Sequence, residues 1–497
     1  MLFRTIATSA IGVIALAVAG ASMGPRWDPD VLKDPLLVQT SSTAIGAPAD
    51  PTPVGTYVVE TRIVPVELDG TQVDAQVSLP VGAPDGLPGV VFVHGAGTGR
   101  YAQAFRAQAH ALASAGIVAM VPDKRLDTYS NRHRDYVRMS GDYEHSVDLL
   151  RSMPEVDPER VGVFGESEGA WIVPVMASDD PALEFTVLVS APVVPPREQA
   201  AFAADSYLRN TGVPSGVFRA IPRAVGMAFP GGGFEYADFE VSPFQQRMGQ
   251  PTFVAYGTGD SSMPTVQGAQ QIITDLEVAG NDAVTVRYYA GANHGIRVDG
   301  EVSTEFVRDL AAWIDGLPES ATASPQVAGD QPHQTFRAEP VPTPRWFGDG
   351  NTVLNTVLGS CGAIVAGAAV WLFARRLRRR GTGLARGLST PLFLLALGSV
   401  LTVAGLVWYL FAITRLALDY DQNAWVVQGG WVGVRFLGIG AVVAGAVLVN
   451  RLDELRTDPD RRAVSGVPAA LSLGLVSAGS LVLLVTLAYW GVFQLGI

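Results

Sequence analysis

Residues 161–177 read VGVFGESEGAWIVPVMA, and this stretch decides the fold. Its first four residues form an apolar run typical of a buried strand, and residues 170–177 have a helical pattern. Between them, Gly-Glu-Ser-Glu-Gly predicts a sharp turn with Ser167 at its tip. We expect both glycines of this turn to be required, because a side chain at either position would collide with the neighbouring strand or helix. A serine hydroxyl at a helix N-terminus indicates a nucleophile, since the helix amides favour developing negative charge.

The flanking segments alternate between short buried strands and helices. A hairpin around Asp69-Gly70 comes first, because two alternating runs meet at this turn. Further strands are expected at 90–93, 116–121, 251–256 and 284–289, and further helices at 101–115, 141–152 and 304–314. This order predicts an α/β fold, with a mostly parallel sheet and helices on both faces.

A serine nucleophile needs a base, and the base needs an orienting acid. The chain has six histidines, and His294 is the one in a loop directly after a late strand pattern. Asp260 ends the preceding strand pattern and is the candidate acid. The remaining histidines lie at a strand–loop junction, on helices, between two arginines or in a Pro-rich segment: His94, His110, His145, His133 and His333. The sequence therefore predicts Ser167, Asp260 and His294 as a triad, each on a loop that follows a strand.

This constellation resembles the α/β-hydrolase family over about residues 57–316. Within the family it is most similar to secreted dienelactone-hydrolase-like and serine-aminopeptidase-like esterases. The segments that carry the resemblance are Gly165–Gly169, Gly257-Thr258-Gly259-Asp260, Asn293-His294-Gly295, His94-Gly95-Ala96-Gly97, Asp123-Lys124-Arg125 and Pro154–Val161. The family fold implied is a mostly parallel sheet with helices on both faces and a lid insertion, here expected at 191–250.

The resemblance implies the roles of the site residues. Ser167 attacks an acyl carbonyl, His294 transfers the proton, and Asp260 orients His294. The backbone N–H groups of Ala96 and Glu168 bind the oxyanion. The reaction implied is cleavage of a small-molecule carboxylic ester or other acyl substrate through an acyl-enzyme, with no cofactor and no metal. The single cysteine independently excludes a multi-thiolate metal site.

Two other functions stay open. A serine peptidase or aminopeptidase would use the same triad, and acids of the lid segment could bind a substrate ammonium: Glu198, Asp205, Glu235, Asp238 and Glu240. A receptor or transport-associated protein could use a hydrolase-like domain only for binding. The carboxylates of Glu166 and Glu168 either act on the site electrostatically or are solvated polar positions.

The composition indicates a membrane protein. Hydrophobic residues make up 48% and charged residues only 16%, and the net charge is −12, which excludes a disordered or nucleic-acid-coating chain. The uncharged stretch that follows Arg4 is long enough to be a helical anchor or a signal peptide. Four later apolar stretches are each long enough to cross a bilayer: 353–374, 391–413, 425–449 and 467–490. The abundance of arginine over lysine suggests a bacterial source.

The basic residues predict the topology. The loops after the first and third of these stretches hold ten arginines, whereas the loop between them holds only Arg415. The positive-inside rule therefore places those two loops in the cytoplasm and the hydrolase segment outside. Arg435 lies within the third stretch, where a charge is costly. We expect it either to pair with Asp419 or Asp421 or to reach an interface by snorkelling.

These observations divide the chain. The expected order is a signal peptide or N-terminal anchor at 1–25, a Pro-rich linker at 26–56, a catalytic domain at 57–316, a second Pro-rich linker at 317–350 and four transmembrane helices at 351–497. Because such linkers make few contacts, residues 50–320 are expected to fold and act without the spans.

Overall fold

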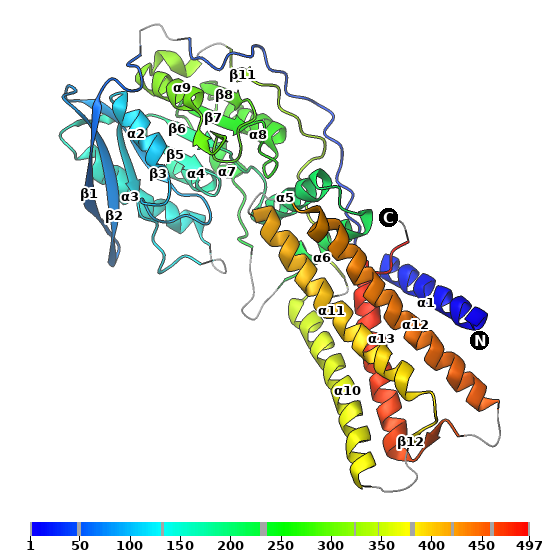
Figure 1. Cartoon of the computed structure of the whole chain (residues 1–497). Coiled ribbons are helices and arrows are strands. Elements are labelled where there is room, and N and C mark those ends of the chain that lie inside the picture. The colour runs from blue at the N-terminus through cyan, green and yellow to red at the C-terminus, as the bar shows by residue number, and fades with distance from the viewer. Residues whose placement is uncertain are drawn as a thin grey trace. The chain divides into compact units, whose positions relative to one another are not determined.

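The computed structural model of the chain (Figure 1) describes residues 2–46, 51–130, 134–228, 236–322, 325–345, 347–377, 383–418, 422–457 and 462–495. These residues form two compact units. The sheet unit comprises Pro29–Ala203 and Phe234–Pro340. The helical unit comprises Met1–Asp28, Ala204–Gly233 and Val341–Ile497. The division therefore differs from the one expected, because a segment inside the expected hydrolase domain belongs to the helical unit.

The sheet unit is built on nine strands in the order β1-β2-β4-β3-β5-β6-β7-β8-β11. The antiparallel pairs are β1 with β2 and β2 with β4, and the remaining neighbours are parallel. The strands are β1 Val58–Leu68, β2 Thr71–Val81, β3 Leu87–Val93, β4 Val118–Pro122, β5 Val156–Glu166, β6 Thr186–Val189, β7 Thr252–Gly257, β8 Val284–Tyr289 and β11 Val327–Gly329. The predicted mostly parallel sheet is confirmed, as is the hairpin, in which Gly70 has a φ of 76°.

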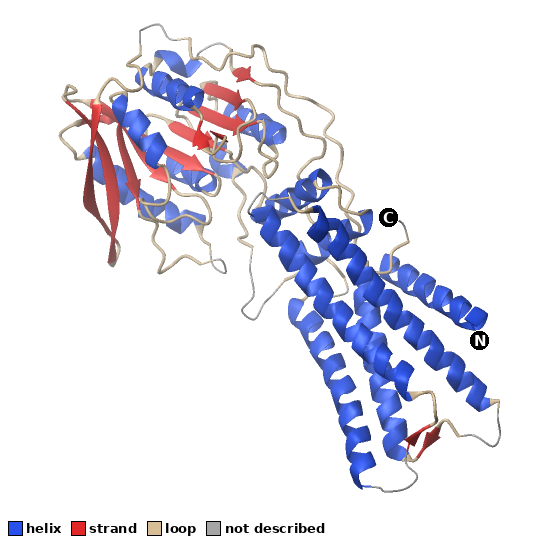
Figure 2. Cartoon of the chain, in the orientation of Figure 1, coloured by secondary structure: helices blue, strands red, loops and turns tan. Residues whose placement is uncertain are grey.

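Helices cover both faces of this sheet (Figure 2). They are α2 Arg106–Ser114, α3 Tyr136–Arg151, α4 Gly169–Asp179, α7 Ser242–Gln245, α8 Thr265–Val278 and α9 Thr304–Asp315. Alternate residues of β3 join opposite cores, because successive side chains of a strand point to opposite faces. Val91 and Val93 pack in the core that includes residues of α3, α4 and α8. Val90 and Phe92 pack in the core that includes residues of α2 and α9.

The helical unit contains five helices long and apolar enough to cross a membrane, counted among the described residues. They are α1 Leu2–Ser22, α10 Gly350–Leu377, α11 Ser389–Leu418, α12 Gly430–Arg456 with the π-helical turn Trp425–Gly429 before it, and α13 Val467–Tyr489. The four expected C-terminal spans are thus present as helices. The first helix, α1, packs against α12 and α13. There, Arg4 forms an ion pair with Asp453 at 2.7 Å.

The structure describes one hydrogen-bond partner of Arg435 on α12. Its Nη2 donates a hydrogen bond to the Gln494 carbonyl at 2.6 Å. Asp419 and Asp421, the acids expected to pair with it, lie outside the described residues. A backbone carbonyl beyond the end of α13 therefore accepts a hydrogen bond from this charged side chain.

The expected lid at 191–250 is divided between the two units. Residues 204–233 belong to the helical unit. They include the second part of α5 Pro196–Asn210, the 3₁₀ turn Ser215–Arg219 and α6 Ala220–Val225. Arg223 of α6 donates to the Gly20 carbonyl of α1 at 3.2 Å, and its guanidinium lies 4.5 Å from the Tyr489 ring centroid. These contacts place the middle of the expected lid within the helical unit. Phe229–Gly233, part of that expected lid, lies outside the described residues.

The two Pro-rich segments are also more structured than expected. Gln39 N–H donates to the Val327 carbonyl at 3.3 Å, and Gly329 N–H donates to the Thr40 carbonyl at 2.9 Å. Residues 327–329 form the edge strand β11 beside β8. These parts make more contacts than the few expected of linkers, because their backbone groups pair with one another at the edge of the sheet.

A buried arginine depends on the same two segments. Arg287 of β8 is fully buried, and its guanidinium donates to the Thr43, Pro325 and Gln326 carbonyls at 2.9, 3.1 and 3.3 Å. Burying a cation is unfavourable unless such hydrogen bonds satisfy it. Residues 50–320 lack all three of these carbonyls.

We therefore expect residues 50–320 to be much less stable than residues 29–340. Both fragments carry the same 204–233 insertion. The difference between their stabilities therefore reports the contribution of the paired edge segments. Losing the partners of a buried charge costs about 3 kcal/mol or more. Differential scanning fluorimetry of the two fragments should show the lower Tm for 50–320, and equal Tm values would contradict the role given to these segments.

Candidate active site

Ser167 occupies the turn between β5 and α4. Its φ is 57°, a left-handed conformation that is rare for residues other than glycine. Its N–H donates to the Val189 carbonyl at the end of β6, at 3.0 Å. A Cβ at Gly165 would lie 2.5 Å from the Gly169 carbonyl oxygen, and one at Gly169 would lie 2.3 Å from the Val93 carbonyl oxygen. The steric reason expected for both glycines is confirmed.

His294 and Asp260 lie on two loops that pack tightly together. The His294 Nδ1 is 2.8 Å from Asp260 Oδ2. Asp260 is held in turn by Ser262, whose N–H and hydroxyl both donate to Oδ1, at 2.9 and 2.7 Å. A Cβ at Gly257 would lie 2.1 Å from the Ala292 carbonyl oxygen, so the loop after β7 can approach the loop after β8 only with glycine there.

The end of β6 connects the serine turn with the histidine loop. Val189 accepts the hydrogen bond from Ser167 N–H, and the next residue, Ser190, donates its hydroxyl to the His294 carbonyl at 2.6 Å. Glu166, directly before Ser167, is close enough to His294 and Asp260 to influence both electrostatically. The three residues predicted from the sequence therefore follow the carboxyl ends of β5, β7 and β8, which belong to one parallel stretch of the sheet, and this edge is the usual place for sites in such sheets.

The charges of the site favour a basic imidazole. Burial opposes protonation of His294, but the Asp260 carboxylate and Glu166 outweigh burial, and the pKa of His294 is raised above its ordinary value of 6.5. The pKa of Asp260 is lowered, because the interactions with His294 and Ser262 exceed the effect of burial. Burial raises the pKa of Glu166. A histidine oriented by an ionised aspartate in this way is suited to accept a proton from a serine.

These shifts predict the pH dependence of hydrolysis. His294 must be neutral to act as a base, so kcat/KM should fall as the pH decreases through its raised pKa, at an apparent pKa above 6.5. Glu166→Gln removes a charge that favours the imidazolium and should move this acid limb to lower pH. Glu184→Gln, the same change at a residue whose charged neighbours are Arg160 and Asp157, should leave the limb in place. An unmoved limb in Glu166→Gln would contradict the assignment of the limb to His294.

The loop after β3 lies against the serine. A Cβ at Gly95 would be 3.3 Å from the Ser167 Cβ. His94 anchors the loop, because its buried ring places Nε2 2.8 Å from the Pro122 carbonyl, and burial lowers its pKa to about 4. Glu168, the other expected oxyanion donor, has helical backbone angles at the start of α4. The predicted donor Ala96 thus follows Gly95, which lies against Ser167. The other predicted donor, Glu168, directly follows Ser167 in the chain.

Glu168 is not a solvated position, although that interpretation was open from the sequence. It is buried, and its Oε2 lies 2.9 Å from Lys124 Nζ. Its Oε1 lies 3.1 Å from Arg134 Nη1. The hydroxyls of Tyr129 and Tyr136 also donate to this carboxylate, at 3.1 and 3.4 Å. The sequence did not predict this cluster, although the Asp123-Lys124-Arg125 segment is one of those that carry the family resemblance.

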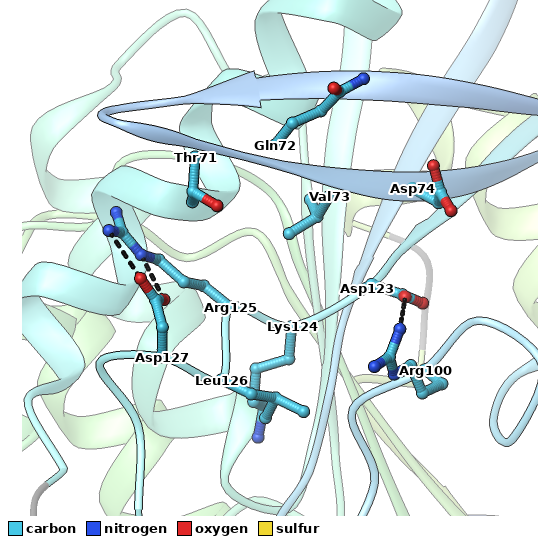
Figure 3. Close-up of a pocket in the computed structure, with 10 residues that line it drawn as sticks. All are labelled: Thr71, Gln72, Val73, Asp74, Arg100, Asp123, Lys124, Arg125, Leu126 and Asp127. Atoms are coloured by element: carbon cyan, nitrogen blue, oxygen red, sulfur yellow. Dashed lines mark hydrogen bonds and ion pairs between the residues drawn. The ribbon is translucent and has the colours of Figure 1, made fainter.

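A polar pocket of about 330 Å³ is lined by residues of β2 and of the loop after β4 (Figure 3). Its ion pairs are Arg100 with Asp123, at 3.0 Å, and Arg125 with Asp127, at 2.8 Å. Neither Ser167 nor His294 lines it. Lys124 contributes to the wall of this pocket, but its ammonium group belongs to the buried contact with Glu168.

The acids considered for binding a substrate ammonium do not all belong to one unit. Asp205 belongs to the helical unit, where Arg209 and the Trp27 indole bind its carboxylate at 2.7 and 2.8 Å. Burial, followed by the charge of Glu240, raises the pKa of Glu198. Glu235 lies outside the described residues. Among the residues that the structure describes, no group of three histidine, cysteine or acidic residues is placed to hold a metal ion.

The serine turn, the strand order and the loops that carry Asp260 and His294 together decide the classification. The sheet unit has the α/β-hydrolase fold. Residues 142–299, which include all three triad candidates, match the family described as BAAT / Acyl-CoA thioester hydrolase C terminal. This match covers less than half of the chain. No curated protein sequence matches the chain.

Solved structures of hydrolases resemble about half of the chain. A cold-adapted esterase from an Arctic intertidal metagenomic library is 15% identical, with 51% of this chain and 93% of that chain covered and a TM-score of 0.33. A dienelactone hydrolase-like promiscuous phosphotriesterase from metagenomic libraries is 16% identical, with 52% and 96% covered and a TM-score of 0.36. The Pyrococcus horikoshii acylaminoacyl peptidase is 16% identical, with 52% and 40% covered and a TM-score of 0.36. These similarities are too remote to indicate a substrate.

Proposed function

We propose that the chain is a membrane-tethered serine hydrolase that cleaves carboxylic esters or thioesters through an acyl-enzyme on Ser167. The observation that carries this proposal is the 2.8 Å contact between Asp260 and His294, on the loops after β7 and β8, together with the φ of 57° at Ser167 in the turn after β5. The match to an acyl-CoA thioester hydrolase family supports acyl transfer as the reaction class.

The proposed reaction assigns one task to each residue. Ser167 attacks the acyl carbonyl while His294 Nε2 accepts the hydroxyl proton, and Asp260 stabilises the imidazolium through Nδ1. The Ala96 and Glu168 N–H groups bind the oxyanion of the tetrahedral intermediate. His294 then protonates the leaving group, and water releases the acyl group from Ser167 by the same steps in reverse.

Labelling with a fluorophosphonate tests this proposal. The reagent should modify Ser167 of the folded full chain, and tryptic mass spectrometry should locate the adduct there. A panel of ester, thioester and aminoacyl substrates then separates esterase, thioesterase and peptidase activity. A folded protein that is not labelled at Ser167 would refute the enzymatic proposal and favour a binding role for this fold.

We further propose that the sheet unit lies outside the cytoplasm and that α1 remains attached as a fifth span. The ten arginines of the two expected cytoplasmic loops support this orientation. The packing of α1 supports its retention, because a Cβ at Gly20 would lie 2.0 Å from the Ala488 carbonyl oxygen of α13. Interfaces between membrane helices commonly use such small residues to bring backbones together.

Cysteine accessibility tests the orientation. In a Cys361→Ser background, Glu301→Cys on the sheet unit should react with a membrane-impermeant maleimide in intact cells. Gly383→Cys, in the loop after α10, should react only after the cells are permeabilised. The reverse pattern would contradict the proposed orientation.

A further inference from the structure

Lys124 connects the two residues predicted to form the oxyanion site. It follows β4 directly, and its ammonium group donates to the Gly95 carbonyl at 2.8 Å and contacts Glu168 Oε2 at 2.9 Å. The side chains of Lys124 and Glu168 are only 2% and 1% exposed. A single buried amine therefore touches the loop after β3 and the first turn of α4 simultaneously.

The carbonyl that Lys124 binds belongs to the same peptide group as the N–H of Ala96, a proposed oxyanion donor. The Gly95 C=O and the Ala96 N–H are parts of one planar unit and point in opposite directions when the bond is trans. Fixing the carbonyl therefore fixes the direction of the Ala96 N–H. Because Gly95 packs against the Ser167 Cβ, a rotation of this unit would change the distance between that N–H and an oxyanion formed at Ser167.

The charges around the pair favour a role in catalysis over a role in folding alone. Glu168 has two cationic neighbours, Lys124 and Arg134, so the cluster carries more positive than negative charge. Buried ion pairs are often no more stable than apolar side chains of similar volume. A net positive cluster beside the position where an oxyanion develops would stabilise that charge without reorganisation.

We propose that Lys124 is a positioning residue that holds the Gly95–Ala96 peptide in the orientation required for oxyanion binding. This inference rests on the proposed function. Lys124 acts through the Ala96 N–H and does not touch the substrate, and Glu168 keeps the lysine in place. The sequence places Lys124 far from Gly95 and Ser167, so only the folded chain brings them together.

The test compares Lys124→Met with Arg100→Met in the full-length protein. Arg100 lines the pocket of Figure 3, and its side chain is 62% exposed. Lys124→Met should lower kcat about 10- to 100-fold on an ester substrate, a loss of the size expected for a misaligned oxyanion donor, with KM within about threefold. Arg100→Met should leave both constants within about twofold. Lys124→Arg, which keeps a cationic donor, should recover part of the lost activity.

An inhibitor measurement separates positioning from a structural effect. A trifluoromethyl ketone forms a tetrahedral oxyanion on the serine, so its affinity should fall by the same factor as kcat/KM. The affinity of the product carboxylate should not change. Unchanged inhibitor affinity in a folded Lys124→Met protein, or unchanged kcat, would overturn the proposal. If Lys124→Met lacks a cooperative melt, the Lys124→Met/Glu168→Gln protein, which removes both charges of the pair, is judged by the same criteria.

Ser167→Ala, measured beside these variants, separates failure of this inference from failure of the proposed function. An inactive Ser167→Ala protein together with a fully active Lys124→Met protein would refute only the role of Lys124. A Ser167→Ala protein as active as the unchanged chain would refute the proposed function itself.

Discussion

Replacing Ser167 with alanine should lower kcat at least about 10³-fold, because the nucleophile of the proposed reaction is lost. His294→Ala should have a similar effect, and the double variant should be no less active than either single variant. The two residues act as one unit, so their losses should not multiply. Initial rates of ester hydrolysis with purified protein measure all three effects.

Two matched controls accompany this experiment. Ser152→Ala removes an exposed hydroxyl, which donates to the Leu149 carbonyl of the same helix end. His110→Ala removes an exposed imidazole of α2. Both should retain full activity. Multiplicative losses for Ser167 and His294 would show that His294 is not the base that serves this serine.

Replacing Gly169 with alanine should disrupt the site without touching a catalytic side chain. The new Cβ would lie 2.3 Å from the Val93 carbonyl oxygen, which is backbone and cannot move aside cheaply. Either α4 or β3 must shift, at a cost of about 1–3 kcal/mol in stability. The proposed oxyanion donors Ala96 and Glu168 lie within three residues of Val93 and Gly169, so we also expect a loss in kcat of at least about 100-fold.

Gly141→Ala is the control for this change. Gly141 lies within α3, and a Cβ there would have no neighbour within 4 Å. The substitution should stabilise the protein by up to about 1 kcal/mol, because alanine favours the helix more than glycine does. Chemical denaturation measures both variants. Equal stability and equal activity of the two proteins would contradict the packing described for the serine turn.

The sequence predicted the strands, helices and triad candidates because each has a local signal. The apolar runs around 161–164 and 284–289 are short and uninterrupted, and Ser167, Asp260 and His294 each follow such a run. The oxyanion loop was predicted by resemblance. These features need no knowledge of contacts between distant parts of the chain.

The missed features depend on distant contacts. Lys124 meets Glu168 and Gly95 only in the folded sheet, and nothing in the residues around Glu168 distinguishes it from the adjacent Glu166. Ser262 had a weak signal, since a serine two residues after an aspartate commonly bonds to its carboxylate. The Pro-rich segments were misinterpreted because their composition is that of a linker, whereas their backbone groups pair at the edge of the sheet.

The membership of residues 204–233 in the helical unit has a consequence for the synthesis of the protein. This segment is made before the helices α12 and α13, yet Gly216 packs beside Trp431 of α12 and Gly491 after α13. Strands β6 and β7, which flank the segment in sequence, can pair as soon as both leave the ribosome. The segment between them cannot complete its packing until α13 has been made. A nascent chain arrested before α13 should therefore expose this segment to chaperones and proteases, and release of the completed chain should protect it.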